Sequence, residues 1–127
     1  MKSALTILEN IIPDFQEKSL KAPFNDKEDI FLRNMSYMRL WTIASELDND
    51  ARALHSASES LSRRFKMYSE SIAQNFHSHD MPLHSSYVGD VHALHVKVRD
   101  GIDQVCFLIT VLEGRTTREV FLKALSD

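Results

Sequence analysis

Histidines are concentrated in one stretch of the chain, NFHSHDMPLHSSYVGDVHALHVKV at residues 75 to 98, which holds five of the six in the sequence. Neutral imidazole rings are common ligands of Zn, Ni, Cu and Fe, and Asp80 or Asp90 could add a carboxylate ligand. A metal site requires the rings to converge, and their spacing matches no established ligand signature. The stretch therefore indicates either a transition-metal site, for example for Zn, or ordinary hydrogen-bonded and solvated histidines. The candidate ligands are His77, His79, His84, His92 and His95.

Motifs of the common enzyme and nucleotide-binding families are absent from the sequence. It contains no GxGxxG, GxxxxGK(S/T), CxxC, HExxH or GxSxG pattern. The single cysteine, Cys106, lies in the apolar run from Val105 to Leu112, where a thiol behaves as a small buried hydrophobe. We therefore expect a protein that is not an enzyme and that carries no cofactor, with the metal as the alternative.

Length and charge restrict the partners that the chain is suited to bind. Its 127 residues are enough for one domain, which we expect to cover residues 1–127. The 15 basic residues are scattered and are outnumbered by 18 acidic ones, so we expect no nucleic-acid partner. The longest apolar run is far shorter than the roughly 20 residues that cross a bilayer, and the first ten residues make a poor secretory signal. A cytoplasmic protein without a membrane partner is the expectation.

Helical periodicity is the main structural signal in the first half of the chain. A short amphipathic helix is predicted after a Ser3 cap and before Pro13, and the sequence Asn25-Asp26-Lys27-Glu28 resembles a capping box that opens a long helix. The cluster Asp48-Asn49-Asp50 is the place where this helix is expected to bend or stop. Beyond the cluster, steps of four and three residues predict a heptad seam. Its members are Leu47, Ala51, Leu54, Ser58, Leu61, Phe65, Tyr68 and Ile72.

Residues 92–111 fit both a helix and a β-hairpin. A heptad seam continues through this region with seven apolar positions of eight, which favours a helix. The same region alternates polar and apolar residues around Asp100-Gly101, which favours a hairpin. We choose the helix because no third strand is visible and an isolated two-stranded hairpin is marginally stable. The seam members are Val88, Val91, His95, Val98, Ile102, Val105, Ile109 and Leu112.

Three further positions mark the packing and the ends of this second helix. Gly101 in a helix interior costs about 1 kcal/mol relative to Ala, which indicates close packing or a kink there. Gly114 is suited to end the helix, and Thr116-Thr117-Arg118-Glu119 resembles a capping box for a last short helix.

Two heptad segments joined by a proline-containing loop predict an all-α fold, a long antiparallel helical hairpin with short flanking helices. The alternative is an α+β fold with a β-hairpin at about 92–111. A hairpin that folds about position 81 places His95 opposite Tyr68. The second helix also has more apolar surface than one partner helix can cover, and we therefore expect a homodimer.

This architecture predicts a small regulatory or adaptor protein that acts by binding another protein, as an inhibitor, an antiactivator or an immunity-type factor. Long amphipathic helices, excess apolar surface and a mildly acidic charge together support this prediction. The residues expected to bind the partner are aromatic or flexible apolar side chains. They are Phe31, Met38, Trp41 and Phe107.

Overall fold

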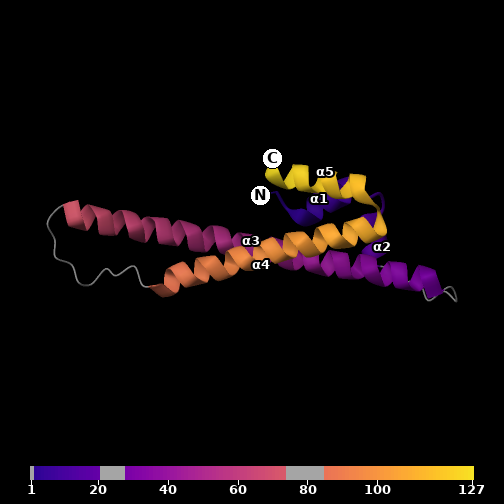
Figure 1. The fold of residues 1–127 in the computed structure, drawn as a ribbon, viewed down its shortest axis with the longest axis horizontal. Helices are drawn as coiled ribbons and strands as arrows, with labels where there is room; N and C mark the ends of the chain where they lie inside the picture. Colours follow the sequence, from indigo (N-terminus) through magenta and orange to yellow (C-terminus); the bar gives the residue numbers. More distant parts are fainter. Residues whose placement is uncertain (1, 21–27, 74–84) are drawn as a thin grey trace.

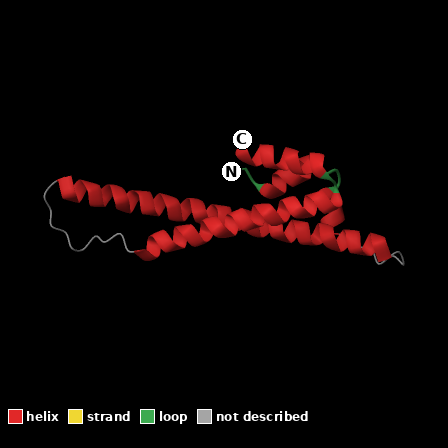
Figure 2. Cartoon of the chain, viewed as in Figure 1, coloured by secondary structure: helices red, strands yellow, loops and turns green. Residues whose placement is uncertain are grey.

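The computed structural model describes residues 2–20, 28–73 and 85–127 (Figure 1). The described chain folds into helices and loops without a strand, as Figure 2 shows, so the all-α prediction is confirmed. The alternative β-hairpin at 92–111 is wrong, because these residues lie within one helix. In chain order the helices are α1 (Ala4–Ile11), α2 (Phe15–Leu20), α3 (Glu28–Ala73), α4 (Ser85–Leu112) and α5 (Arg115–Ser126).

The two long helices, α3 and α4, run antiparallel and cross near their middles (Figure 1). At the crossing Gly101 faces Leu47 so closely that a Cβ atom on Gly101 would lie 3.1 Å from Leu47 Cδ1. The predicted close packing at Gly101 is therefore confirmed. Glycine suits this position because a Cβ atom would press on the side chain of Leu47.

The register of the hairpin differs from the predicted one. Leu47 packs on Gly101, and Ile43 and Gln104 line one hollow together. The residue numbers of such facing pairs average about 74, whereas the predicted hairpin folds about position 81. In this register His95 lies opposite the region of Ala53 and not opposite Tyr68. The proposed pairing of His95 with Tyr68 is therefore wrong.

The three short helices lie together on one side of the α3–α4 crossing (Figure 1). α1 contacts α3 and α5, while α2 packs on α3 and α5 packs on α4. One apolar core forms between these helices and the crossing, and its largest fully buried side chains come from every helix. They are Phe15, Tyr37, Phe121, Leu8, Ile12, Leu40, Leu47, Ile109 and Val105.

Asp48 does not stop α3, which runs through this position to Ala73. Its buried carboxylate instead caps the start of α1, where Ala4 N donates to Oδ1 at 2.6 Å and Leu5 N donates to Oδ2 at 3.2 Å. Ser3 Oγ also donates to Oδ2 at 2.8 Å and accepts a hydrogen bond from Thr6 N. The predicted Ser3 cap is confirmed, and a carboxylate suits the positive end of the α1 dipole.

Gly114 separates α4 from α5 with φ of 98°, a conformation that L side chains rarely adopt. The prediction that Gly114 ends the second long helix is confirmed. The predicted capping box at Thr116 to Glu119 is wrong, because α5 already begins at Arg115 and its N-cap is Gly114 without a side-chain hydrogen bond.

The end of α4 is attached to the first part of α3 by a side chain. Arg33 Nη2 donates to the carbonyl oxygen of Leu112 at 3.0 Å, which satisfies one of the free carbonyls at the helix end. Glu113 lies 3.9 Å from the same guanidinium and 4.0 Å from Lys18 Nζ, so this junction also contacts α2.

The capping box predicted at Asn25 to Glu28 lies mostly outside the described residues. Within the described ranges, no helix combines the length and the apolar composition needed to cross a membrane.

Candidate protein-binding surface

The structure places only two of the five candidate metal ligands. His92 and His95 are exposed on α4, three residues apart, while His77, His79 and His84 lie outside the described residues. In the parts of the chain that the structure describes, no group of three or more His, Cys, Asp or Glu side chains is arranged to hold a metal ion. A site for Zn therefore stays a prediction that depends on residues outside the described ranges.

The four candidate partner-binding residues have different surroundings. Phe107 on α4 is 67% exposed, whereas Trp41 on α3 is partly buried and packs against the core. Met38 is half-buried, and the side chain of Phe31 is outside the described part of α3. Only Phe107 of these four is thus observed as a large apolar side chain on the surface.

Phe107 borders a hollow of about 290 Å³ between α3 and α4. Ile43 from α3 and Leu108 from α4 supply further apolar walls. Arg39 and Asp103, both exposed, place one charge of each sign at its rim. The complete lining is Arg39, Ile43, Asp103, Gln104, Phe107 and Leu108.

Apolar surface extends from this hollow toward the end of α4. Val111 follows Phe107 by one helical turn and is 63% exposed. Met35, one turn before Arg39 on α3, is 45% exposed, and the antiparallel register places it near Val111. We call Met35, Ile43, Phe107, Leu108 and Val111, with their charged rim, the Phe107 surface.

The helical geometry determines which predicted residues belong to this surface. Successive residues of an α-helix are about 100° apart around the axis, so Trp41 and Ile43 point to different sides of α3. Trp41 is consequently not part of the Phe107 surface. Arg39, Ile43 and Met35 were not predicted as binding residues, because their position beside the α4 seam becomes visible only when the register is known.

Cys106 lies beside Phe107 in sequence but on the buried side of α4. Burial raises the pKa of the Cys106 thiol, against the lowering effect of the nearby Arg118 guanidinium. A raised pKa leaves little thiolate near neutral pH, so the geometry provides no activated sulfur nucleophile at this position. The expectation that Cys106 is a buried hydrophobe agrees with its 3% exposure.

Two larger hollows of the described chain are bordered mostly by polar and charged residues. One of about 510 Å³ lies at the α3–α4 crossing and is bordered by Glu46, Asp50, Lys97 and Asp100. Another of about 560 Å³ lies where the N-terminal residues meet α3, and its buried carboxylate, Asp48, is already used to cap α1. Small-molecule sites are usually lined by apolar side chains with a few polar groups, which these hollows do not resemble.

Comparison with known proteins adds no further assignment, because no protein-family model, no curated protein and no solved structure matches this chain.

Proposed function

We propose that the protein is a small non-enzymatic regulatory or adaptor protein that binds another protein through the Phe107 surface. The observation that carries the proposal is the exposure of Phe107 and Val111, 67% and 63%, on the part of α4 that is anchored in the core. Large apolar side chains that are exposed together on a rigid helix are typical of interaction sites.

The hollow beside Phe107, of about 290 Å³, is a groove between two helices. Such grooves bind the apolar face of an amphipathic helix. We therefore propose a helical partner segment that inserts an apolar side chain beside Phe107 and pairs an acidic side chain with Arg39.

The regulatory classes that match this mode of binding are those anticipated from the sequence: an inhibitor, an antiactivator or an immunity-type factor. Each of them acts by covering a surface of its target and needs no catalytic group of its own. A cytoplasmic location remains part of this proposal, as does the homodimer, whose surface is considered below.

A photo-crosslinking amino acid at position 107 tests the proposal in cells of the source organism. We expect one defined crosslinked product that contains a different protein, because the ring of the crosslinker replaces the exposed ring of Phe107. The matched control carries the same amino acid at Val120 of α5, which is 45% exposed and lies outside the Phe107 surface. The product must be lost when Val111→Asp is added to the position-107 variant.

Two outcomes contradict the proposal. Equal products from positions 107 and 120 would show that crosslinking follows exposure alone. A single product with the mass of two copies of this chain would assign the Phe107 surface to self-association instead of a protein partner.

A further inference from the structure

The apolar stripe that α3 contributes to the core continues beyond the core. Leu40 and Leu47 are buried, whereas Phe65 and Tyr68 on the same stripe are 59% and 37% exposed. The residues follow one another in steps of four and three, which is the spacing of a helix that packs along another helix. In order the stripe consists of Leu40, Ala44, Leu47, Ala51, Leu54, Ser58, Leu61, Phe65 and Tyr68.

The apolar stripe of α4 also becomes exposed toward the same end of the molecule. Val105 and Val98 are buried near the crossing, but His95 is exposed and Val88 is 53% exposed. Figure 1 shows the cause, because α3 and α4 separate as they run away from the crossing. We call residues 61–70 of α3 and 88–95 of α4 the open arms.

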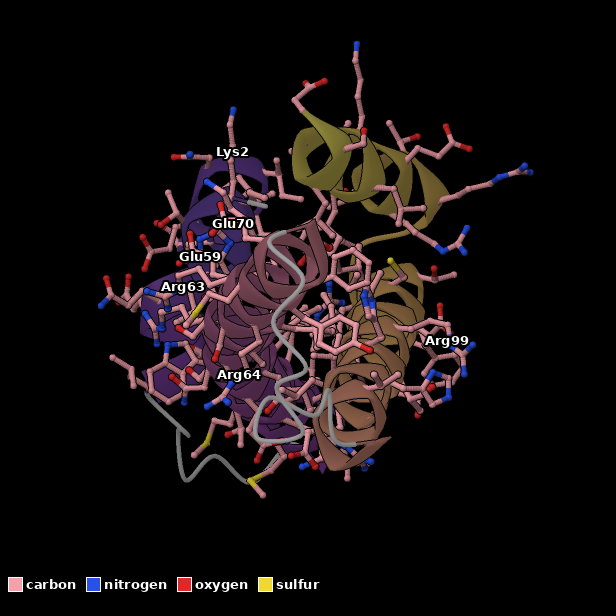
Figure 3. The ribbon with its side chains drawn as sticks, turned by 90° about the vertical axis from the view of Figure 1, so that its left-hand side faces the viewer. Lys2, Glu59, Arg63, Arg64, Glu70 and Arg99 are labelled. Atoms are coloured by element: carbon pink, nitrogen blue, oxygen red, sulfur yellow. The ribbon has the colours of Figure 1, made fainter. Side chains whose placement is uncertain are left out.

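The charged side chains of the open arms lie away from this apolar stripe. Figure 3 shows Glu59, Arg63 and Glu70 on the side of α3 that is remote from α4, and Arg99 on the outer side of α4. At about 100° per residue, Glu59, Arg63 and Glu70 project roughly opposite to Phe65. On the inner side of the α3 arm, Leu61, Phe65 and Tyr68 therefore lie beside the small polar side chains of Ser62 and Ser69.

We propose that the open arms bind a second copy of this chain, with the α3 arms antiparallel and a twofold axis near Phe65. A heptad stripe is covered by a helix that carries the same repeat, and the repeat of this stripe is the one that α4 covers at the crossing. The dimer interface therefore continues the helix packing that already exists within one chain.

The spacing of the α3 arm is self-complementary for such a twofold axis. Leu61 precedes Phe65 by four residues and Tyr68 follows it by three, so an antiparallel pair places Leu61 beside the partner's Tyr68. Phe65 then contacts the equivalent ring of the second copy, as expected for an interface that uses the same patch twice.

The exposed rings supply part of the area that a stable dimer requires. A fully exposed aromatic side chain can bury about 150–250 Å², and Phe65 and Tyr68 keep 59% and 37% of their surface exposed for burial by a second copy. A specific interface needs roughly 1,000 Å² of buried surface in total. Leu61 and Val88 contribute further area to it. Because Glu59, Arg63 and Glu70 point outward, the interface forms without burying these charges.

The mass of the untagged full chain in solution is the first test. Light scattering should give twice the 14.6 kDa of one chain for the natural protein and for Val120→Asp. Phe65→Asp should give the monomer with an unchanged circular dichroism spectrum, because Phe65 is outside the core. A natural protein that is monomeric at all concentrations, or a Phe65→Asp variant that stays dimeric, would overturn the proposal.

A disulfide test locates the interface through the proximity of two thiols. In a Cys106→Ser background, Phe65→Cys places one thiol per copy near the proposed axis, and Phe107→Cys serves as the exposed control. We expect the dimer disulfide to form at least about tenfold faster at position 65, because dimerisation raises the effective concentration of the second thiol. Equal rates, or a faster reaction at position 107, would contradict an interface at the open arms.

Discussion

Asp48 fastens the start of α1 to the middle of α3 through one buried carboxylate. We expect Asp48→Ala to lower the free energy of unfolding by about 2–3 kcal/mol, because it removes a helix cap and leaves buried amide donors without a partner. Urea denaturation followed by the fluorescence of Trp41, the single tryptophan, measures the change.

Asp50→Ala is the matched control for this prediction. Asp50 lies two residues away on α3 and borders the polar hollow at the crossing instead of the start of α1, so we expect a change within about 0.5 kcal/mol. If both variants lose the same stability, the effect would come from the charge of α3 and not from the cap of α1.

Gly114 and Gly89 provide opposite outcomes for the same substitution. A Cβ atom added at either glycine would have no neighbouring atom within 4 Å. The two positions differ in backbone conformation, because Gly114 has φ of 98° and Gly89 lies in α4. Gly114→Ala should therefore destabilise the protein by about 1–3 kcal/mol through backbone strain. Gly89→Ala should stabilise it by about 0.5–1 kcal/mol, because alanine has the higher helix propensity. Thermal unfolding of the two variants compares them directly, and changes of the same sign would contradict the reasoning.

At the scale of the elements, α3 and α4 leave little room for a side chain at Gly101, where they cross. Gly101→Ala gains about 1 kcal/mol of helix propensity but presses on Leu47, so we expect a net change smaller than about 1 kcal/mol. Gly101→Val adds a branched side chain against a fully buried neighbour and should destabilise by about 2 kcal/mol or more. Urea midpoints of the two variants measure the difference, and a tolerated valine would show that the helices can move apart.

The helices could be predicted from the sequence because their signals are local. The four-and-three spacing identified both long helices, and Ser3 and Gly114 marked two helix boundaries correctly. The expected stop of the long helix at Asp48 was wrong, because a residue that favours a helix end can also act on another element. Asp48 lies in the interior of α3, and its carboxylate caps α1.

The register and the candidate site could be predicted only in part, because both depend on contacts between elements. A heptad seam repeats, so shifting α4 along α3 by whole heptads preserves the apolar match. The pairing of Leu47 with Gly101 was therefore not available from periodicity, and neither were Arg39 and Ile43 as neighbours of Phe107. Phe107 itself was predictable, because it falls outside the seam of its own helix.

At the scale of the whole molecule, burial is concentrated at the crossing while the open arms carry exposed apolar residues. The local stability of α3 should follow this division, because opening the helix at the crossing disrupts the core and opening it in the arm does not. We expect amide hydrogens of residues 61–70 to exchange at least about 100-fold faster than those of residues 40–47 in the monomeric Phe65→Asp variant.

Hydrogen exchange measured on the natural protein completes this comparison. At concentrations where the chain is dimeric, exchange in residues 61–70 should slow toward that of the core, since a second copy then covers Phe65 and Tyr68. Exchange in residues 40–47 should stay the same, because these residues already pack in the core of one chain. Uniform protection along α3 in the Phe65→Asp variant would mean that α3 opens as one cooperative unit and that the arms need no second copy for their stability.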